Sequence, residues 1–149
     1  MPRPPRSTMS HLSRALAFVT LGLASAAHAQ IDGGWKPNAL EVAQLPTYCQ
    51  GSFRPDLAGK PGYSLPQGCG VWINHFCPAM VALNRAGNLT APMKDRVYSL
   101  RSASDHLAYT RNHLQPTCPL TGELALLERR AEFLRIMVCL LYTSPSPRD

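Results

Sequence analysis

Four cysteines constrain this 149-residue chain more than any other feature of its sequence. They are Cys49, Cys69, Cys77 and Cys118; a fifth, Cys139, lies in a C-terminal stretch that is discounted below. In an exported chain an even number of cysteines predicts disulfide bonds, and four cysteines allow three pairings. Loop-closure entropy limits the contribution of one such bridge to about 4 kcal/mol, a large fraction of the stability of a small domain.

The N-terminus has the pattern of an export signal. Three arginines precede an apolar run at residues 15–24, and small residues follow up to Ala29. This order of basic, apolar and small residues predicts a secretory signal peptide at residues 1–29. The apolar run is too short to span a bilayer, so we expect a periplasmic or secreted product that begins at Gln30 and has no membrane attachment after cleavage.

The last eleven residues, 139–149, read CLLYTSPSPRD. They resemble the translation of a transposase-type sequencing-library adapter, residue for residue. We therefore interpret 139–149 as an adapter-derived artefact and expect the natural chain to continue beyond Val138. The segment that folds is then a single domain at residues 30–138.

Removal of both ends lowers the net charge. Of the 15 Lys and Arg, three lie in 1–29 and one in 139–149, which leaves 11. Of the nine Asp and Glu only Asp149 is removed, which leaves eight and a net charge of +3. The basic residues are scattered and form no stripe, so we predict no nucleic-acid partner.

The segment at residues 71–85 predicts the central helix of the core. Its large apolar residues recur at helical spacing and place most of the apolar volume on one face. Pro78 predicts a kink, or two helical pieces that meet at Cys77 and Pro78. We interpret His75 as a hydrogen-bonded packing residue. The core residues predicted on this helix are Trp72, Phe76, Met80 and Leu83.

The remaining pattern predicts an all-α fold. Short helical spacing covers residues 39–45, glycines and prolines at 51–70 predict an irregular loop, and two longer helices follow at 93–113 and 121–138. No run alternates as a strand does. In the helix at 93–113 we expect the polar and charged residues to lie on the solvated side, and these are Arg96, Arg101, Asp105, His106, Arg111 and His113.

Three motifs carry a resemblance to a known group. They are LPTYC at 45–49, W-x-x-H-F-C at 72–77 and ALNRA at 82–86, followed by a helix with Leu100, Ala103 and Tyr109. Together they resemble an uncharacterised group of exported bacterial proteins with tetratricopeptide-type (TPR-like) repeats. The resemblance implies that Cys49 pairs with Cys77 and that residues 120–138 open a truncated array of helix hairpins. Cys69–Cys118 is the preferred second bridge.

The function expected from this reading is an exported scaffold that binds a protein or peptide through stacked helix pairs. The chain carries no G-x-S-x-G, phosphate-loop or H-E-x-x-H motif, so we predict neither an enzyme nor a cofactor. The alternative is a small metal-binding or thiol protein that uses Cys49, His75, Cys77 and Cys118. A related zinc site would replace Cys118 by His106.

Overall fold

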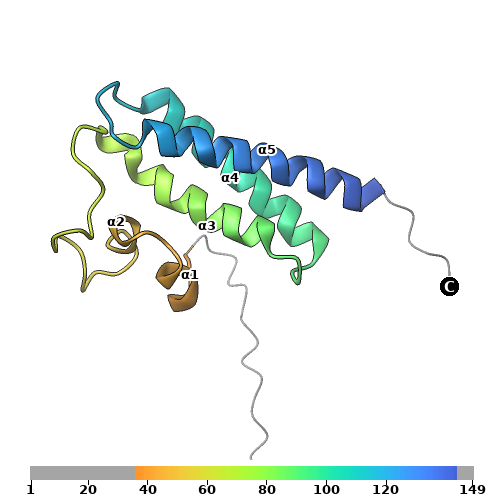
Figure 1. Cartoon of the computed structure of the whole chain (residues 1–149). Coiled ribbons are helices and arrows are strands. Elements are labelled where there is room, and N and C mark those ends of the chain that lie inside the picture. The colour runs from red at the N-terminus through yellow and green to blue at the C-terminus, as the bar shows by residue number, and fades with distance from the viewer. Residues whose placement is uncertain (1–35, 144–149) are drawn as a thin grey trace, which may run out of the picture. The chain divides into compact units, whose positions relative to one another are not determined.

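The computed structural model describes the chain from residue 36 to residue 143, with side chains to residue 140. This part is helical and contains no β-strand, which confirms the predicted all-α class (Figure 1). The described residues include most of the domain predicted at residues 30–138, whereas the signal peptide predicted at residues 1–29 lies outside them. The elements are α1 (Ala39–Ala43), α2 (Thr47–Gln50), the 3-10 helix η1 (Val71–His75), α3 (Phe76–Gly87), α4 (Met93–His113) and α5 (Thr121–Thr143).

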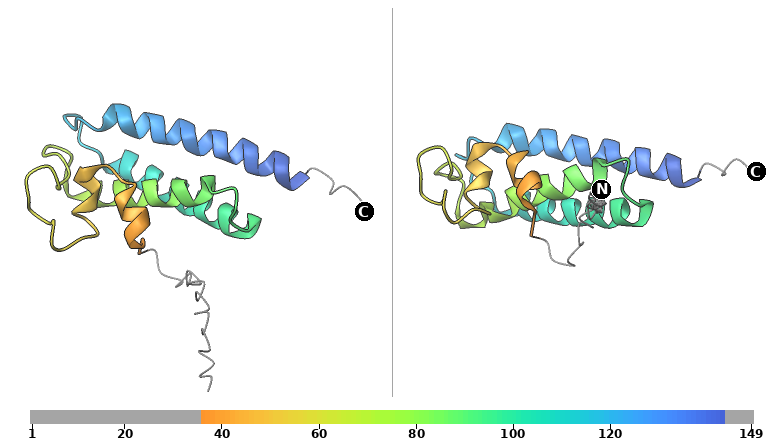
Figure 2. Two further views of the ribbon diagram at one scale, coloured as in Figure 1. Left: turned by 60° about the horizontal axis from the view of Figure 1, so that its bottom comes forward. Right: turned by 90° about the horizontal axis from the view of Figure 1, so that it is seen from below.

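The three long helices α3, α4 and α5 form a bundle. Short connections at 88–92 and 114–120 join them, so consecutive helices run in opposite directions (Figure 2). Each of the three contacts the other two. The core between them contains small and large apolar side chains from every helix, among them Ala79, Leu83, Ala103, Leu107, Leu127 and Leu134.

The helical segment at 71–87 is divided, but not where the proline predicts. The boundary between η1 and α3 falls between His75 and Phe76, and α3 continues without a break through Pro78. Pro78 is the third residue of α3. In the first turn of a helix the backbone N–H has no intrahelical acceptor, so proline costs no hydrogen bond there. The expected kink at Cys77 and Pro78 is therefore wrong.

The connection between α3 and α4 depends on a buried arginine. Arg96 was expected on the solvated side of its helix, but only 3% of it is exposed. Its Nε donates a hydrogen bond of 3.0 Å to the carbonyl oxygen of Ala86. The last carbonyls of a helix lack intrahelical donors, and Arg96 supplies one at the end of α3. The residue pattern of α4 does not reveal this role of Arg96, because the carbonyl group that it contacts belongs to α3.

The segment before α3 lies against the bundle through polar links. Asn38 caps α1 in a reciprocal capping box with Glu41. Glu41 also accepts hydrogen bonds of 2.5 and 2.9 Å from Arg85 of α3, and these hold the pKa of its carboxyl below the usual range. Tyr48 of α2, a helix that the sequence did not predict, donates a hydrogen bond of 2.5 Å to Glu123 of α5.

Two disulfide bonds complete this attachment, and both predicted pairs are formed. Cys49 of α2 is bonded to Cys77 of α3, and Cys69 is bonded to Cys118 in the connection before α5. Between Gly51 and Gly70 the chain has turns but no helix or strand, as predicted. The two bridges interlace along the sequence, since Cys69 lies inside the loop closed by the first bridge and Cys118 lies outside it.

Candidate functional site

The cysteines predicted as disulfide candidates are structural. All four take part in the two bridges and all four are buried. The alternative reading, a metal-binding or thiol protein using Cys49, His75, Cys77 and Cys118, needs thiolates, and these sulfur atoms are already bonded. Within residues 36–143 no three His, Cys, Asp or Glu side chains are grouped as metal ligands.

Three of the four residues predicted to lie in the core on this helix are buried. Phe76 and Leu83 are fully buried and Met80 is 8% exposed, whereas Trp72 is 48% exposed. The reason for this correction is the 3-10 geometry of η1. In an α-helix Trp72 and Phe76 would share a face, but three residues per turn rotate Trp72 away from it. Trp72 therefore contributes to a surface cluster on α4.

That cluster, called the ring cluster below, consists of five rings: Trp72, His75, His106, Tyr109 and His113. Tyr109 of α4 stacks between His75 of η1 and His113 of α4, with ring centroids 4.1 and 4.2 Å away. Trp72 packs against Tyr109 and His113 at 6.0 and 5.6 Å. Such tilted and stacked contacts between rings are favourable beyond their burial. They join η1 to the side of α4 on which His106 and His113 were predicted to be exposed.

Two histidines of the ring cluster form a direct hydrogen bond. The Nδ1 atoms of His75 and His106 lie 2.8 Å apart, so one ring donates and the other accepts. Burial lowers the pKa of His106, and the neighbouring His75 lowers it further, while Asp105 acts in the opposite direction. The expectation for His75 is confirmed. The expectation that His106 and His113 are exposed is wrong, since both are half-buried.

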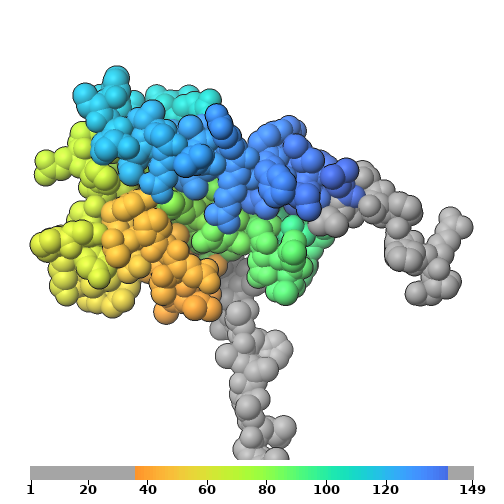
Figure 3. Space-filling model, in the orientation of Figure 1, coloured from red at the N-terminus to blue at the C-terminus, as the bar shows by residue number. Residues whose placement is uncertain are grey.

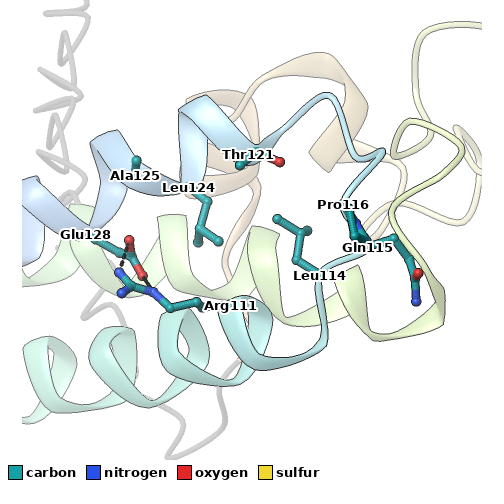
Figure 4. A pocket seen from close by; sticks show the side chains of 8 residues that line it. All are labelled: Arg111, Leu114, Gln115, Pro116, Thr121, Leu124, Ala125 and Glu128. Carbon is teal, nitrogen blue, oxygen red and sulfur yellow. Dashed lines mark hydrogen bonds and ion pairs between the residues drawn. The ribbon is translucent and has the colours of Figure 1, made fainter.

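Two small hollows lie between α4 and α5. They have volumes of about 290 and 300 Å³, and both include Arg111 and Glu128 in their linings. These two residues form an ion pair at the edge shared by both linings, and Leu114 and Leu124 line the first hollow (Figure 4). Each volume is at the lower limit for small-molecule sites, so these hollows suit single side chains better than a cofactor.

The most prominent surface feature is the side of α5 that faces away from the bundle. Leu126, Phe133 and Ile136 are 64%, 60% and 51% exposed there, and we call these three residues the outer face of α5. Leu140, 59% exposed, continues the row at the end of the described side chains. In the space-filling view no other segment covers α5 on the side turned to the viewer (Figure 3).

The outer face is a regular counterpart of the buried face. The buried residues of α5 are spaced by three and four, as predicted, and each residue of the outer face follows one of them by two positions. With 3.6 residues per turn, two positions correspond to opposite sides of the helix. The helix therefore has two apolar faces, of which the buried one consists of Leu124, Leu127, Ala131, Leu134 and Val138.

The glutamates of α5 have hydrogen-bond or ion-pair partners, whereas two of its arginines have no carboxylate partner among the described residues. Glu123 accepts from Tyr48, Glu128 is paired with Arg111, and Glu132 is paired with Arg135. Arg129 and Arg130 are exposed and form no ion pair among the described residues. Both lie between Leu126 and Phe133 along the helix. Arg129 thus lies on the outer face, and Arg130 lies at its edge, close to the end of α3.

Comparisons of the chain with protein-family models, with curated proteins and with solved structures found no match. Among the described residues no helix has the length and apolar content needed to cross a bilayer.

Proposed function

We propose that this protein is an exported helical scaffold that binds a protein or peptide partner, and that the outer face of α5 is its contact surface. The observation that carries the proposal is the second apolar face of α5, with Leu126, Phe133 and Ile136 each more than half exposed. A helix that is polar on its outer side needs no further neighbour, whereas one that is apolar on both sides is typical of a position between two packed elements. Clustered exposed apolar residues are a sign of an interaction surface.

Two further observations support the proposal. Buried disulfides between Cys49 and Cys77 and between Cys69 and Cys118 agree with an oxidising compartment, as an exported protein requires. The antiparallel pair α3–α4, followed by α5 after a short connection, has the order of elements that a TPR-like array of helix hairpins repeats. In such arrays each unit covers an apolar face of the next.

Photo-crosslinking from inside the candidate surface tests the proposal. A benzophenone amino acid replaces Phe133 in the intact chain, produced in its own host, and the culture is irradiated. We expect a discrete product that joins this chain to another polypeptide, because the side chain at position 133 faces the partner.

The matched control places the same reagent at Tyr98 of α4, which is 74% exposed and lies outside the outer face of α5. This position should give no such product. Equal products from both positions, or none from position 133, would contradict the proposal.

A further inference from the structure

We infer that the segment bound by the outer face of α5 is an amphipathic helix with carboxylate side chains beside its apolar stripe. This inference rests on the proposed function and specifies the partner's chemistry. It depends on three properties of α5: the spacing of the exposed apolar residues, the positions of two arginines, and the engagement of every acidic residue of the helix.

The spacing of the outer face fits a helix. Leu126 and Phe133 are seven residues apart and Ile136 follows three residues later, the spacing at which two helices pack side by side along a seam. The row between Leu126 and Ile136 extends about 15 Å along the axis at 1.5 Å per residue. An extended peptide that binds by adding a strand to a sheet would need an open strand edge, and the described residues contain no strand.

The two arginines lie in and beside the seam that a helical partner would contact. Arg129 and Arg130 are three and four residues after Leu126, and four and three before Phe133, so they lie one turn from each. Arg129 is also seven residues before Ile136 and so lies in the seam itself, whereas Arg130 lies beside the seam, at a position where salt bridges set partner choice in helix pairs. Arg130 also approaches the end of α3, where a Cβ on Gly87 would be 3.7 Å from its guanidinium. Neither arginine has a carboxylate partner among the described residues.

Charge complementarity favours a foreign acidic helix over a second copy of this chain. Glu123, Glu128 and Glu132 already have partners in Tyr48, Arg111 and Arg135. A second α5 would therefore bring two more arginines and no unengaged carboxylate of its own. A partner with Glu or Asp beside its apolar residues supplies the missing charge and avoids this repulsion.

The test compares two synthetic peptides by fluorescence anisotropy with the full chain. Both form helices with leucines at the same heptad positions; one has Glu and the other Lys at the flanking positions. We expect the Glu peptide to bind at least about 10-fold more tightly, and its advantage to shrink between 50 and 500 mM salt, because exposed charges are screened. The double variant Arg129→Glu and Arg130→Glu should reverse the preference.

Matched variants separate charge from apolar contact. Arg101→Glu changes an exposed arginine of α4 away from the outer face and should alter either affinity less than about twofold. Phe133→Ala should weaken binding of the Glu peptide about 10-fold or more, since exposed aromatic anchors dominate such contacts. Tyr98→Ala, at an exposed aromatic residue of α4, should leave it unchanged.

Three outcomes would overturn the inference. If both peptides bound equally and Phe133→Ala weakened both, the outer face would bind a helix but would not prefer acidic flanking residues. Absence of binding by either peptide, together with a cross-link from position 133, would leave the proposed function standing with a different partner class. Self-association in sedimentation that Phe133→Ala abolishes would make a second copy the occupant.

Discussion

Residues 36–75 bury few apolar side chains, whereas the bundle α3–α5 buries most of the core. Before α3 the fully packed apolar residues, apart from two cysteines, are Val42, Leu45 and Ile73. This segment is held by links to the bundle, which are two disulfides, the Glu41–Arg85 pair, the Tyr48–Glu123 hydrogen bond and the contacts of the ring cluster. The bundle α3–α5 is therefore specified by the periodicity of its apolar residues, whereas the fold of residues 36–75 is specified by a few individual connections.

Removal of the Cys69–Cys118 disulfide is expected to have the largest effect on stability and to affect mainly the segment before α3. The double variant Cys69→Ala and Cys118→Ala should lower the free energy of unfolding by up to about 4 kcal/mol, because the unfolded chain regains the freedom of a long loop. Hydrogen exchange should show the loss of protection concentrated at residues 51–75, with amides of α4 less affected. A uniform loss over all helices would show that the two regions are a single cooperative unit.

A cavity in the bundle should reduce hydrogen-exchange protection in the three long helices more than at residues 51–75. Leu83 is fully buried in α3, and Leu83→Ala should destabilise the chain by about 3 kcal/mol because it removes packed methyl groups. Urea unfolding measures the change, and hydrogen exchange should show it spread over α3, α4 and α5. Val71→Ala, at a residue that is 80% exposed, is the control and should change the stability little. Comparable losses in the two variants would contradict the assignment of the core.

Acid should weaken the contact between the two regions through the ring cluster. The folded state lowers the pKa of His106 below its ordinary value of 6.5, chiefly by burial and also through His75, while Asp105 opposes the shift. The unfolded chain therefore takes up a proton first as the pH falls. The stability present above pH 6.5 is lost as the pH falls through the folded-state pKa. The ring of Tyr109 also stacks on His75.

Thermal unfolding between pH 7.5 and pH 5 measures this acid dependence. His106→Gln, which has no titrating ring, should flatten the decline in Tm. An equally steep decline in the variant would show that other groups are responsible.

The smallest expected effect is a gain in stability inside α4. Thr110 is 1% exposed, and its hydroxyl is buried without a hydrogen-bond partner. Thr110→Val replaces that hydroxyl by a methyl group and should stabilise the bundle by about 1 kcal/mol. Thr110→Ser, which keeps the hydroxyl and loses the methyl, should destabilise it. A loss of stability in the valine variant, measured by urea unfolding, would indicate that the hydroxyl is satisfied in solution.

The sequence predicted the elements that depend on local periodicity. The bounds of α4 and the start of α5 agree with the patterns at 93–113 and from Thr121, because apolar spacing and prolines mark them directly. The short helix α2 was missed, since four residues between Pro46 and Gly51 are too few for a periodic signal. Its position depends on the Cys49–Cys77 bond, which is a tertiary property.

The candidate surfaces were less predictable because each depends on a neighbouring helix. Arg96 and His106 have the composition of a solvated face, and only α3 and η1 show that one caps a helix and the other completes a ring pair. The outer face of α5 did leave a signal. Leu126 and Phe133 are seven residues apart, and each follows a core residue by two positions, which indicates a helix with two apolar sides.

Under the proposed export of this chain, the interlaced order of the two bridges has a consequence for its biogenesis. Such a chain emerges from its membrane N-terminus first, so Cys49 and Cys69 reach the oxidising side before either native partner. Pairing by order of arrival would join these two cysteines and leave Cys77 with Cys118. The native pairs of Cys49 with Cys77 and Cys69 with Cys118 therefore require delayed oxidation or later thiol exchange. Maturation of this protein is thus expected to depend on a disulfide isomerase more than on an oxidant alone.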